Sequence, residues 1–258
     1  MSSPTADEAT RRRLIGVMFG ANAFSSTAYI STITVASIVG ATFTGSPSLA
    51  GVPSTVATVG TAIGAIVLAW AGARIGRRRS HTIGFLVAGV GAGGAAYAIA
   101  TESFSVFLAT FFVLGFGRSI SQLARFAAGD LRRESRRGAA ISLIVWASTI
   151  GSVLGPALIG PSGDWVRSLG GSELLGPVLV GVVGFTIATL VSFVGLRPDP
   201  LTLAVADTDH EDDLAHPTGI SLGSILSKTS VQLAFAALVV SQLVMVFVMT
   251  MTPVHISA

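Results

Sequence analysis

The chain has 258 residues, of which 51% are hydrophobic and 11% are charged, and its mean hydropathy is +0.75. Soluble globular domains contain about 25% charged residues, so this composition excludes a soluble protein and predicts one that lies in a lipid bilayer. The formal net charge is +3, but 13 of the 16 Lys and Arg residues lie before the first apolar stretch or in alternate gaps between the stretches. We therefore assign the basic balance to membrane topology and expect no nucleic-acid partner.

Seven stretches are long and apolar enough for a membrane-spanning helix, which needs about 20 such residues. In chain order they are residues 14–39, 51–72, 81–101, 104–128, 138–160, 174–196 and 231–254. The first is longer than the apolar core of a cleaved signal peptide, about 7 to 15 residues, so we interpret it as a retained span. The sequence thus predicts an all-α membrane protein with a six-helix transmembrane bundle followed by a seventh helix.

Arginine clusters occupy every second gap, and the intervening gaps hold a single arginine, Arg167. Because short loops rich in Lys and Arg stay in the cytoplasm, we expect a multi-pass protein of the plasma (inner) membrane with its N-terminus inside. The predicted parts are a cytoplasmic tail at 1–13, the six-helix bundle at 14–196, a polar cytoplasmic linker at 197–230, and the first helix of an incomplete second bundle at 231–258.

Small residues recur at four-residue spacing within the predicted spans. In lipid this spacing lets helix backbones approach closely, so these glycines are predicted to be packing contacts between helices. The pairs are Gly16 and Gly20, Gly60 and Gly64, Gly89 and Gly93, and Gly151 and Gly155.

The gap after the second span reads A-W-A-G-A-R-I-G-R-R-R at residues 69–79. It resembles the signature loop between helices 2 and 3 of the major facilitator superfamily, whose pattern is G-x-x-x-D-R-x-G-R-R. Alanines stand in place of its first glycine and its acidic residue, whereas the matching positions are Arg74, Gly76, Arg77 and Arg78. A glycine permits a tight turn here, and the arginines can pair with helix C-terminal carbonyls or with Asp130.

Two further stretches resemble the same family. Asp130 and Arg137 match its Asp and Arg-Gly bracket between helices 4 and 5. The other stretch resembles the helix-5 motif G-x-x-x-G-P, which in the family is associated with drug and proton antiporters, and is carried here by Gly151, Gly155, Pro156 and Gly160. Pro156 removes a backbone hydrogen bond, so this helix can bend, either in the service of transport or as an ordinary proline kink.

The resemblance implies a secondary active transporter that moves small molecules by alternating access of two six-helix halves, here by efflux of amphiphilic or drug-like compounds with proton coupling. It implies no cofactor, no metal site and no enzymatic activity. Since the chain would hold the first half and one helix of the second, we expect a fragment, a truncated product or a split transporter that needs the missing C-terminal half, or a complementary half, for transport. The arginine loop would form a cytoplasmic gate with Asp130 or Glu134 in place of the absent carboxylate, and plain positive-inside charge is the alternative.

Arg118 falls near the middle of the fourth predicted span, where a buried charge costs at least about 2.5 to 3.5 kcal/mol. Gln122 and Arg125 follow at i+4 and i+7, so the three side chains share one helical face, which we predict to line the substrate cavity. A structural ion pair is the alternative for Arg118, and Arg125 lies near enough to the end of the span to snorkel. No Asp or Glu lies in the middle of any predicted span, so the sequence offers neither a partner for Arg118 nor a membrane carboxylate for proton exchange.

A second polar face lies in the first span, where Asn22, Ser26 and Tyr29 stand at i, i+4 and i+7. First helices of bundles in this family commonly line the central cavity, so the resemblance implies a substrate surface. Hydrogen bonding between helices is an equally ordinary role for such side chains. Gln242 in the seventh span is a further cavity candidate.

A seven-helix receptor or scaffold without transport activity is the alternative function. A retinal-binding photoreceptor would need a buried lysine, but the only lysine, Lys228, precedes the last span. An intramembrane enzyme is disfavoured, since the sequence has no cysteine, no mid-span carboxylate and no histidine pair for a nucleophile system or a metal site.

Overall fold

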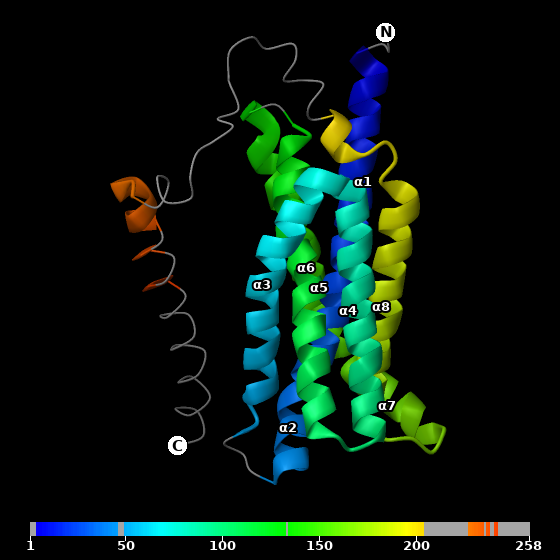
Figure 1. Ribbon diagram of the computed structural model, residues 1–258. Helices are drawn as coiled ribbons and strands as arrows, with labels where there is room; N and C mark the ends of the chain where they lie inside the picture. The colour runs from blue at the N-terminus through cyan, green and yellow to red at the C-terminus, as the bar shows by residue number, and fades with distance from the viewer. Residues whose placement is uncertain are drawn as a thin grey trace. The chain divides into compact units, whose positions relative to one another are not determined.

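The computed structural model describes residues 4–45, 49–132, 134–203, 227–234, 236, 237, 240 and 241. Within these residues the chain is predominantly helical and contains no strand (Figure 1). The helices are α1 (Pro4–Thr34), α2 (Ala36–Thr44), α3 (Val52–Ile75), α4 (Arg77–Ala100), α5 (Phe104–Asp130), α6 (Glu134–Ala157), α7 (Ile159–Ser168) and α8 (Leu175–Gly195). Six helical segments of the described chain are long and apolar enough to cross a membrane, which confirms the all-α multi-pass fold.

The first spanning segment is longer at both ends than the sequence predicts. It runs from Glu8 to Thr44 through α1 and α2, and α1 itself begins at Pro4, so most of the predicted cytoplasmic tail is helical. Two contacts explain this extension. Glu8 pairs with Arg12 one helical turn later at 3.2 Å, and Arg11 is only 7% exposed because it donates to the carbonyl oxygen of Leu131.

The fifth predicted span is interrupted near its end. Pro156 lies in the last turn of α6, which stops at Ala157, and a second helix, α7, occupies the gap that was expected to be a loop. Pro161 falls in the first turn of α7, where a missing backbone N–H breaks no helical hydrogen bond. Two prolines five residues apart therefore divide the helix, and Gly160 belongs to α7 rather than to α6.

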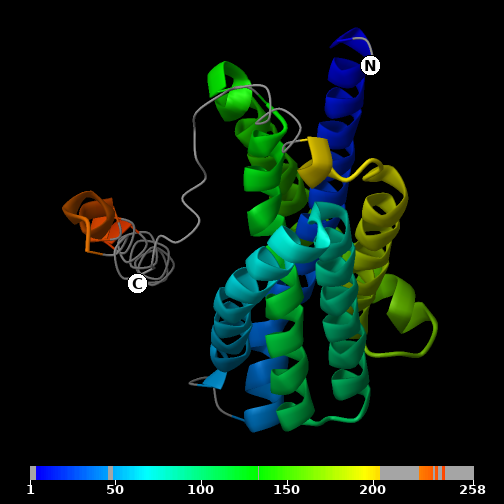
Figure 2. The same ribbon diagram turned by 45° about the horizontal axis from the view of Figure 1, so that its top comes forward.

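Helix α5 packs against both α3 and α4, while α1 packs against α6 and α8, and α4 also packs against α8. Figures 1 and 2 show these long helices running side by side. Two glycines of α5 permit the close approach. A Cβ atom on Gly115 would lie 1.9 Å from the carbonyl oxygen of Ala57 in α3, and one on Gly117 would lie 2.3 Å from the backbone nitrogen of Ala88 in α4.

Two of the four predicted glycine pairs are confirmed as helix contacts. A Cβ atom on Gly60 or Gly64 would approach a backbone oxygen of α5 to 2.2 or 2.3 Å, and one on Gly151 or Gly155 would approach a Cβ atom of α1 to 2.4 or 2.7 Å. At three other positions the described part of the chain does not supply the predicted contact, because a Cβ atom there would meet no described atom within 4 Å: Gly16, Gly20 and Gly93. Four-residue spacing creates a smooth helix face, but it does not say whether another helix lies against that face.

The chain stays attached to the bundle after α8 ends. Leu196 is fully buried, and Leu203 packs against the same apolar cluster as Leu14 and Leu131. The stretch predicted as a solvated linker, 197–230, thus begins with a segment that packs on the bundle. Two compact units are distinguished, Met1–His210 and Glu211–Ala258. Most of the seventh predicted span lies outside the described residues, and so does Gln242.

Candidate functional site

The turn between α3 and α4 consists of a single residue, Gly76, with φ +93° and ψ 156°. A side chain is strained at this φ, and a Cβ atom there would also lie 2.3 Å from a carboxylate oxygen of Asp199. Glycine is therefore required for two reasons: its backbone conformation would strain a side chain, and Asp199 leaves no room for one. We call the end of the bundle that carries this turn the arginine end.

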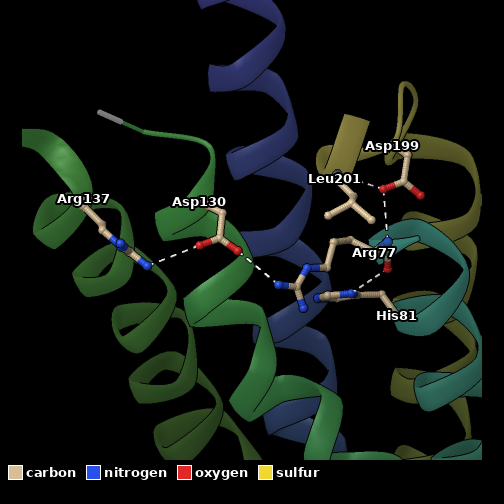
Figure 3. A network of polar contacts seen from close by, with 6 residues as sticks. All are labelled: Arg77, His81, Asp130, Arg137, Asp199 and Leu201. Atoms are coloured by element: carbon tan, nitrogen blue, oxygen red, sulfur yellow. Dashed lines mark hydrogen bonds and ion pairs between the residues drawn. The ribbon is translucent and has the colours of Figure 1, made fainter. Parts of the chain in front are cut away.

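Asp199, which lies beyond α8, holds the start of α4. Its carboxylate accepts hydrogen bonds from the backbone N–H groups of Arg77 at 3.0 Å and Leu201 at 2.9 Å (Figure 3). It also accepts from the backbone N–H of Arg78 at 3.2 Å. A carboxylate at a helix N-terminus satisfies backbone donors that have no partner within the helix and favours the positive end of the helix dipole. Asp199 thus places a negative charge beside the turn whose own acidic residue is replaced by alanine.

Asp199 was not expected from the sequence, because it lies more than 120 residues from the turn that it caps. The available signal was a carboxylate between two prolines, Pro198 and Pro200, directly after an apolar span. That pattern indicates a fixed turn next to a helix end, but nothing in it identifies which helix start the carboxylate would reach.

Asp130 at the end of α5 joins two other helices at the arginine end. Its two carboxylate oxygens accept from the guanidinium of Arg77 on α4 at 3.1 Å and from that of Arg137 on α6 at 3.3 Å (Figure 3). The sequence proposed Asp130 or Glu134 as the substitute carboxylate. The structure brings Asp130 to Arg77, and the side chain of Glu134 lies outside the described residues.

The other residues of the predicted gate take separate partners. The Nε–H of Arg78 donates to the carbonyl oxygen of Phe193 at 3.0 Å, and its guanidinium lies 4.9 Å from the Phe193 ring centroid, which ties α4 to α8. Arg74 lies instead over the ring of Trp70 at 4.1 Å. The network around Gly76 therefore contains Arg77, Asp130 and Arg137, but it does not include Arg74.

His81 adds a contact within α4, one turn below Arg77. Its Nδ1 lies 2.8 Å from the carbonyl oxygen of Arg77, so the Nδ1–H donates and the imidazole is held against the network (Figure 3). The ring is buried, with 2% exposure, and its Nε2 has no hydrogen-bond partner within the described chain.

The predicted cavity residues Arg118 and Tyr29 come together although they lie on different helices. The guanidinium carbon of Arg118 on α5 lies 3.7 Å from the ring centroid of Tyr29 on α1. The partner of this mid-span cation is therefore an aromatic face, which attracts a cation through its quadrupole. Among the described residues the buried Nε of Arg118 has no hydrogen-bond partner.

Gln122 and Arg125 interact with each other on the same helix. The guanidinium of Arg125 donates to the side-chain carbonyl oxygen of Gln122. Arg118, Gln122 and Arg125 thus follow one another along α5, from its middle toward the arginine end. Their predicted role in lining a substrate cavity remains a prediction.

Asn22 and Ser26 lie in the contact between α1 and α6. The side-chain amide of Asn22 donates to the carbonyl oxygen of Ile144 at 3.0 Å and to the hydroxyl of Ser148 at 2.9 Å, and Asn22 is 1% exposed. Ser26 is 2% exposed and packs against Gly151. The sequence left two roles open for these residues, a substrate surface and hydrogen bonding between helices. The contacts of Asn22 and Ser26 are those of hydrogen bonding and packing between helices.

The helix-5 motif forms the other half of this contact. Gly151 and Gly155 face Ser26 and Ile30 of α1 so closely that neither could carry a side chain without displacing that helix. In the described part of the chain, no atom lies within 4 Å of the Cβ position of Gly160. The motif therefore has two structural roles. Gly151 and Gly155 allow α6 to pack closely against α1, and Pro156 marks the end of α6.

Comparison with known proteins agrees with this architecture. The family profile of the Major Facilitator Superfamily matches residues 17–258. Two relatives from Bacillus subtilis (strain 168), the uncharacterized MFS-type transporters YddS and YdeG, are 29% and 30% identical over 99% of the chain. The riboflavin transporter RfnT of Brucella anthropi is 27% identical over 96% of the chain.

The chain spans 59% to 60% of the length of these three relatives. The family profile covers almost the whole chain, including the six described helical segments able to cross a membrane apart from the beginning of the first. The resemblance found in the arginine turn and in the helix-5 motif is thereby confirmed at the level of the family, and it favours a transporter over a receptor. The chain belongs to the Major Facilitator Superfamily of membrane transporters.

Proposed function

We propose that the protein is a secondary active transporter that exports small amphiphilic molecules from the cytoplasm by alternating access, with its six-helix unit as one of the moving halves. The observation that carries this proposal is the Arg118–Tyr29 pair. Arg118 is the fifteenth of the 27 residues of α5, so it lies near the middle of the membrane. A cation at this depth is costly, and such residues line substrate pathways far more often than they serve packing alone.

The pair offers two kinds of recognition to a substrate. The guanidinium supplies hydrogen-bond donors that no described residue accepts from, and the phenol ring of Tyr29 supplies an apolar face beside them. A planar molecule with polar substituents can use both. Because one relative is a riboflavin transporter and riboflavin has this chemistry, riboflavin is the first probe to apply.

The arginine end supplies the gate in this proposal. Asp130 holds Arg77 and Arg137, and Asp199 holds the first backbone groups of α4, so three helices and the segment after α8 are tied together at one end of the bundle. Opening that end would require these contacts to exchange partners. Proton coupling stays a prediction from the sequence, and the mid-membrane groups that support transport here are Arg118 and Tyr29.

Removing the cation should abolish export. Cells that produce the chain together with a complementary second half and are loaded with riboflavin should release it faster than cells that produce the complementary half alone. Arg118→Ala should reduce this excess release by about tenfold or more, because the substrate loses its charged hydrogen-bond donor. Arg118→Lys should retain part of the activity, since the charge remains but the planar fork is lost. Flavin fluorescence outside the cells measures the release.

Two different failures of this experiment can be distinguished. Release no faster than from cells that produce the complementary half alone contradicts export of this class of molecule. Fast release that Arg118→Ala leaves unchanged contradicts the site alone. The matched control is Arg167→Ala, which removes an exposed arginine of α7 that pairs with Asp164 and Glu173. Each variant must reach the membrane in the same amount as the unaltered chain.

We also propose that the arginine end faces the cytoplasm. The chain has no cysteine, so a single introduced thiol reports sidedness without background. A membrane-impermeant maleimide added to intact cells should label Ser172→Cys, between α7 and α8, and should label Arg79→Cys, in the first turn of α4, only after the membrane is permeabilised. Both positions are exposed. The opposite labelling pattern would reverse the proposed orientation.

A further inference from the structure

A pocket of about 270 Å³ lies between α1 and α6 at the arginine end. It is separate from the Gly76 network and from the Arg118–Tyr29 pair. Three arginines and four apolar side chains line it: Arg12, Arg132, Arg136, Ile15, Ala139, Ala140 and Leu143. We call this pocket the arginine groove.

The groove carries an excess of positive charge. Glu8 pairs with Arg132 at 2.5 Å and with Arg12 at 3.2 Å, and it is the one carboxylate that pairs with these arginines among the described side chains. Among the described side chains, three guanidinium groups and one carboxylate give a local charge of 3 − 1, or +2. The guanidinium groups of Arg12 and Arg132 are both held by Glu8, so they are oriented without being neutralised. Arg136 is exposed and forms no ion pair within the described chain.

The floor of the groove is apolar and continues along α6. Ile15 and Ala140 are buried, with 4% and 5% exposure, whereas Leu143 is 42% exposed. From Leu143 a stripe of exposed apolar side chains follows the helix toward the middle of the membrane, at i+3, i+7 and i+10. Its further members are Trp146, Ile150 and Val153. The positive charge thus lies where a lipid headgroup would be, and the apolar stripe lies where its acyl chain would be.

We propose that the arginine groove binds an anionic phospholipid, with the phosphate at Arg12, Arg132 and Arg136 and one acyl chain along the stripe from Leu143 to Val153. Guanidinium groups bind phosphate oxygens through paired N–H donors, and basic pockets between membrane helices suit anionic headgroups. A zwitterionic lipid adds its own cation to a groove that is already positive, so it is disfavoured. A free phosphate would satisfy the arginines but would leave the apolar stripe without a role.

Trp146 provides a direct measurement, because it lies on the stripe and is 66% exposed. In a chain carrying Trp70→Phe and Trp165→Phe, Trp146 is the only tryptophan left of three. Phosphatidylglycerol with brominated acyl chains, titrated into the purified chain in detergent, should quench Trp146 at lower lipid concentration than brominated phosphatidylcholine. Removing one arginine should weaken the phosphatidylglycerol effect about fivefold, and the pair Arg12→Gln with Arg136→Gln should weaken it by more than about tenfold.

Arg136→Gln is the decisive single variant, since it breaks no ion pair of the described chain and should leave the fold intact. Arg79→Gln is the matched control, because Arg79 is also an exposed arginine at this end but does not line the groove. Equal quenching by the two lipids, or a loss as large in Arg79→Gln as in Arg136→Gln, would overturn the proposal. Displacement of the brominated lipid by inorganic phosphate at equal concentration would also overturn it, because the site would then bind phosphate without the acyl chain.

Discussion

Gly115→Ala should lower the free energy of unfolding of the six-helix unit by about 3 kcal/mol, the upper part of the range for overpacking a helix contact. The added methyl group would lie 1.9 Å from the carbonyl oxygen of Ala57 and 2.7 Å from its carbonyl carbon. Both are backbone atoms of α3, so no side chain can rotate away and the two helices must separate. Unfolding of the purified chain in detergent, followed by circular dichroism against denaturant concentration, measures the change.

Gly93→Ala is the matched control for this prediction. Gly93 is also a glycine within a membrane helix, but a Cβ atom there would meet no atom of the described residues within 4 Å. We expect this variant to be unchanged or more stable by up to about 1 kcal/mol, because alanine favours a helix over glycine. If both variants unfold alike, the close contact between α3 and α5 does not contribute to stability in the way that we describe.

The second large effect is expected at Asp199. Asp199→Ala removes one carboxylate that accepts from three backbone N–H groups, those of Arg77, Arg78 and Leu201. A lost helix cap costs about 0.5 to 2 kcal/mol, and bonds to a charged group lie at the high end, so we expect a loss of about 2 kcal/mol. Hydrogen exchange should also accelerate at the first turn of α4, and mass spectrometry of peptides from that turn measures it.

Two further variants test whether the effect comes from the charge of Asp199 and from its position. Asp199→Asn keeps an oxygen acceptor but removes the charge, so its exchange rate should lie between those of the alanine variant and the unaltered chain. Asp164→Ala removes an exposed carboxylate that pairs with Arg167 on α7, and a surface pair of this kind contributes at most about 1 kcal/mol. Unchanged exchange at α4 in Asp199→Ala would show that the cap does not hold this turn.

The two predicted polar faces show what residue spacing predicts: it places residues on one face of a helix, but it does not identify their partners. Asn22, Ser26 and Tyr29 share a face of α1, and Arg118 shares a face of α5 with Gln122. The structure divides the first group, because Asn22 bonds to α6 while Tyr29 lies under Arg118. A helix face is wide enough to touch two neighbours, so periodicity within one helix cannot assign each residue to its partner.

The carboxylates at the arginine end also show that the sequence predicts some contacts between helices and not others. The missing acidic residue of the arginine turn was visible in the sequence, and Asp130 was a correct expectation for contact with Arg77. Asp199 was not expected, since it caps α4 from beyond the end of α8. Backbone N–H groups at a helix start can donate to any nearby carboxylate, so the sequence near the helix does not specify which carboxylate caps it.

The sequence by itself determined the membrane class, the first six spans and the family, because hydrophobic length and local motifs are properties of contiguous residues. Only the tertiary structure decided which glycines are contacts, which carboxylate caps α4, that Arg118 rests on Tyr29, and that three arginines share a groove with an apolar floor. Each of these depends on atoms of different helices within a few ångströms of one another. Such distances follow from how the helices pack, which residue spacing along a single helix does not contain.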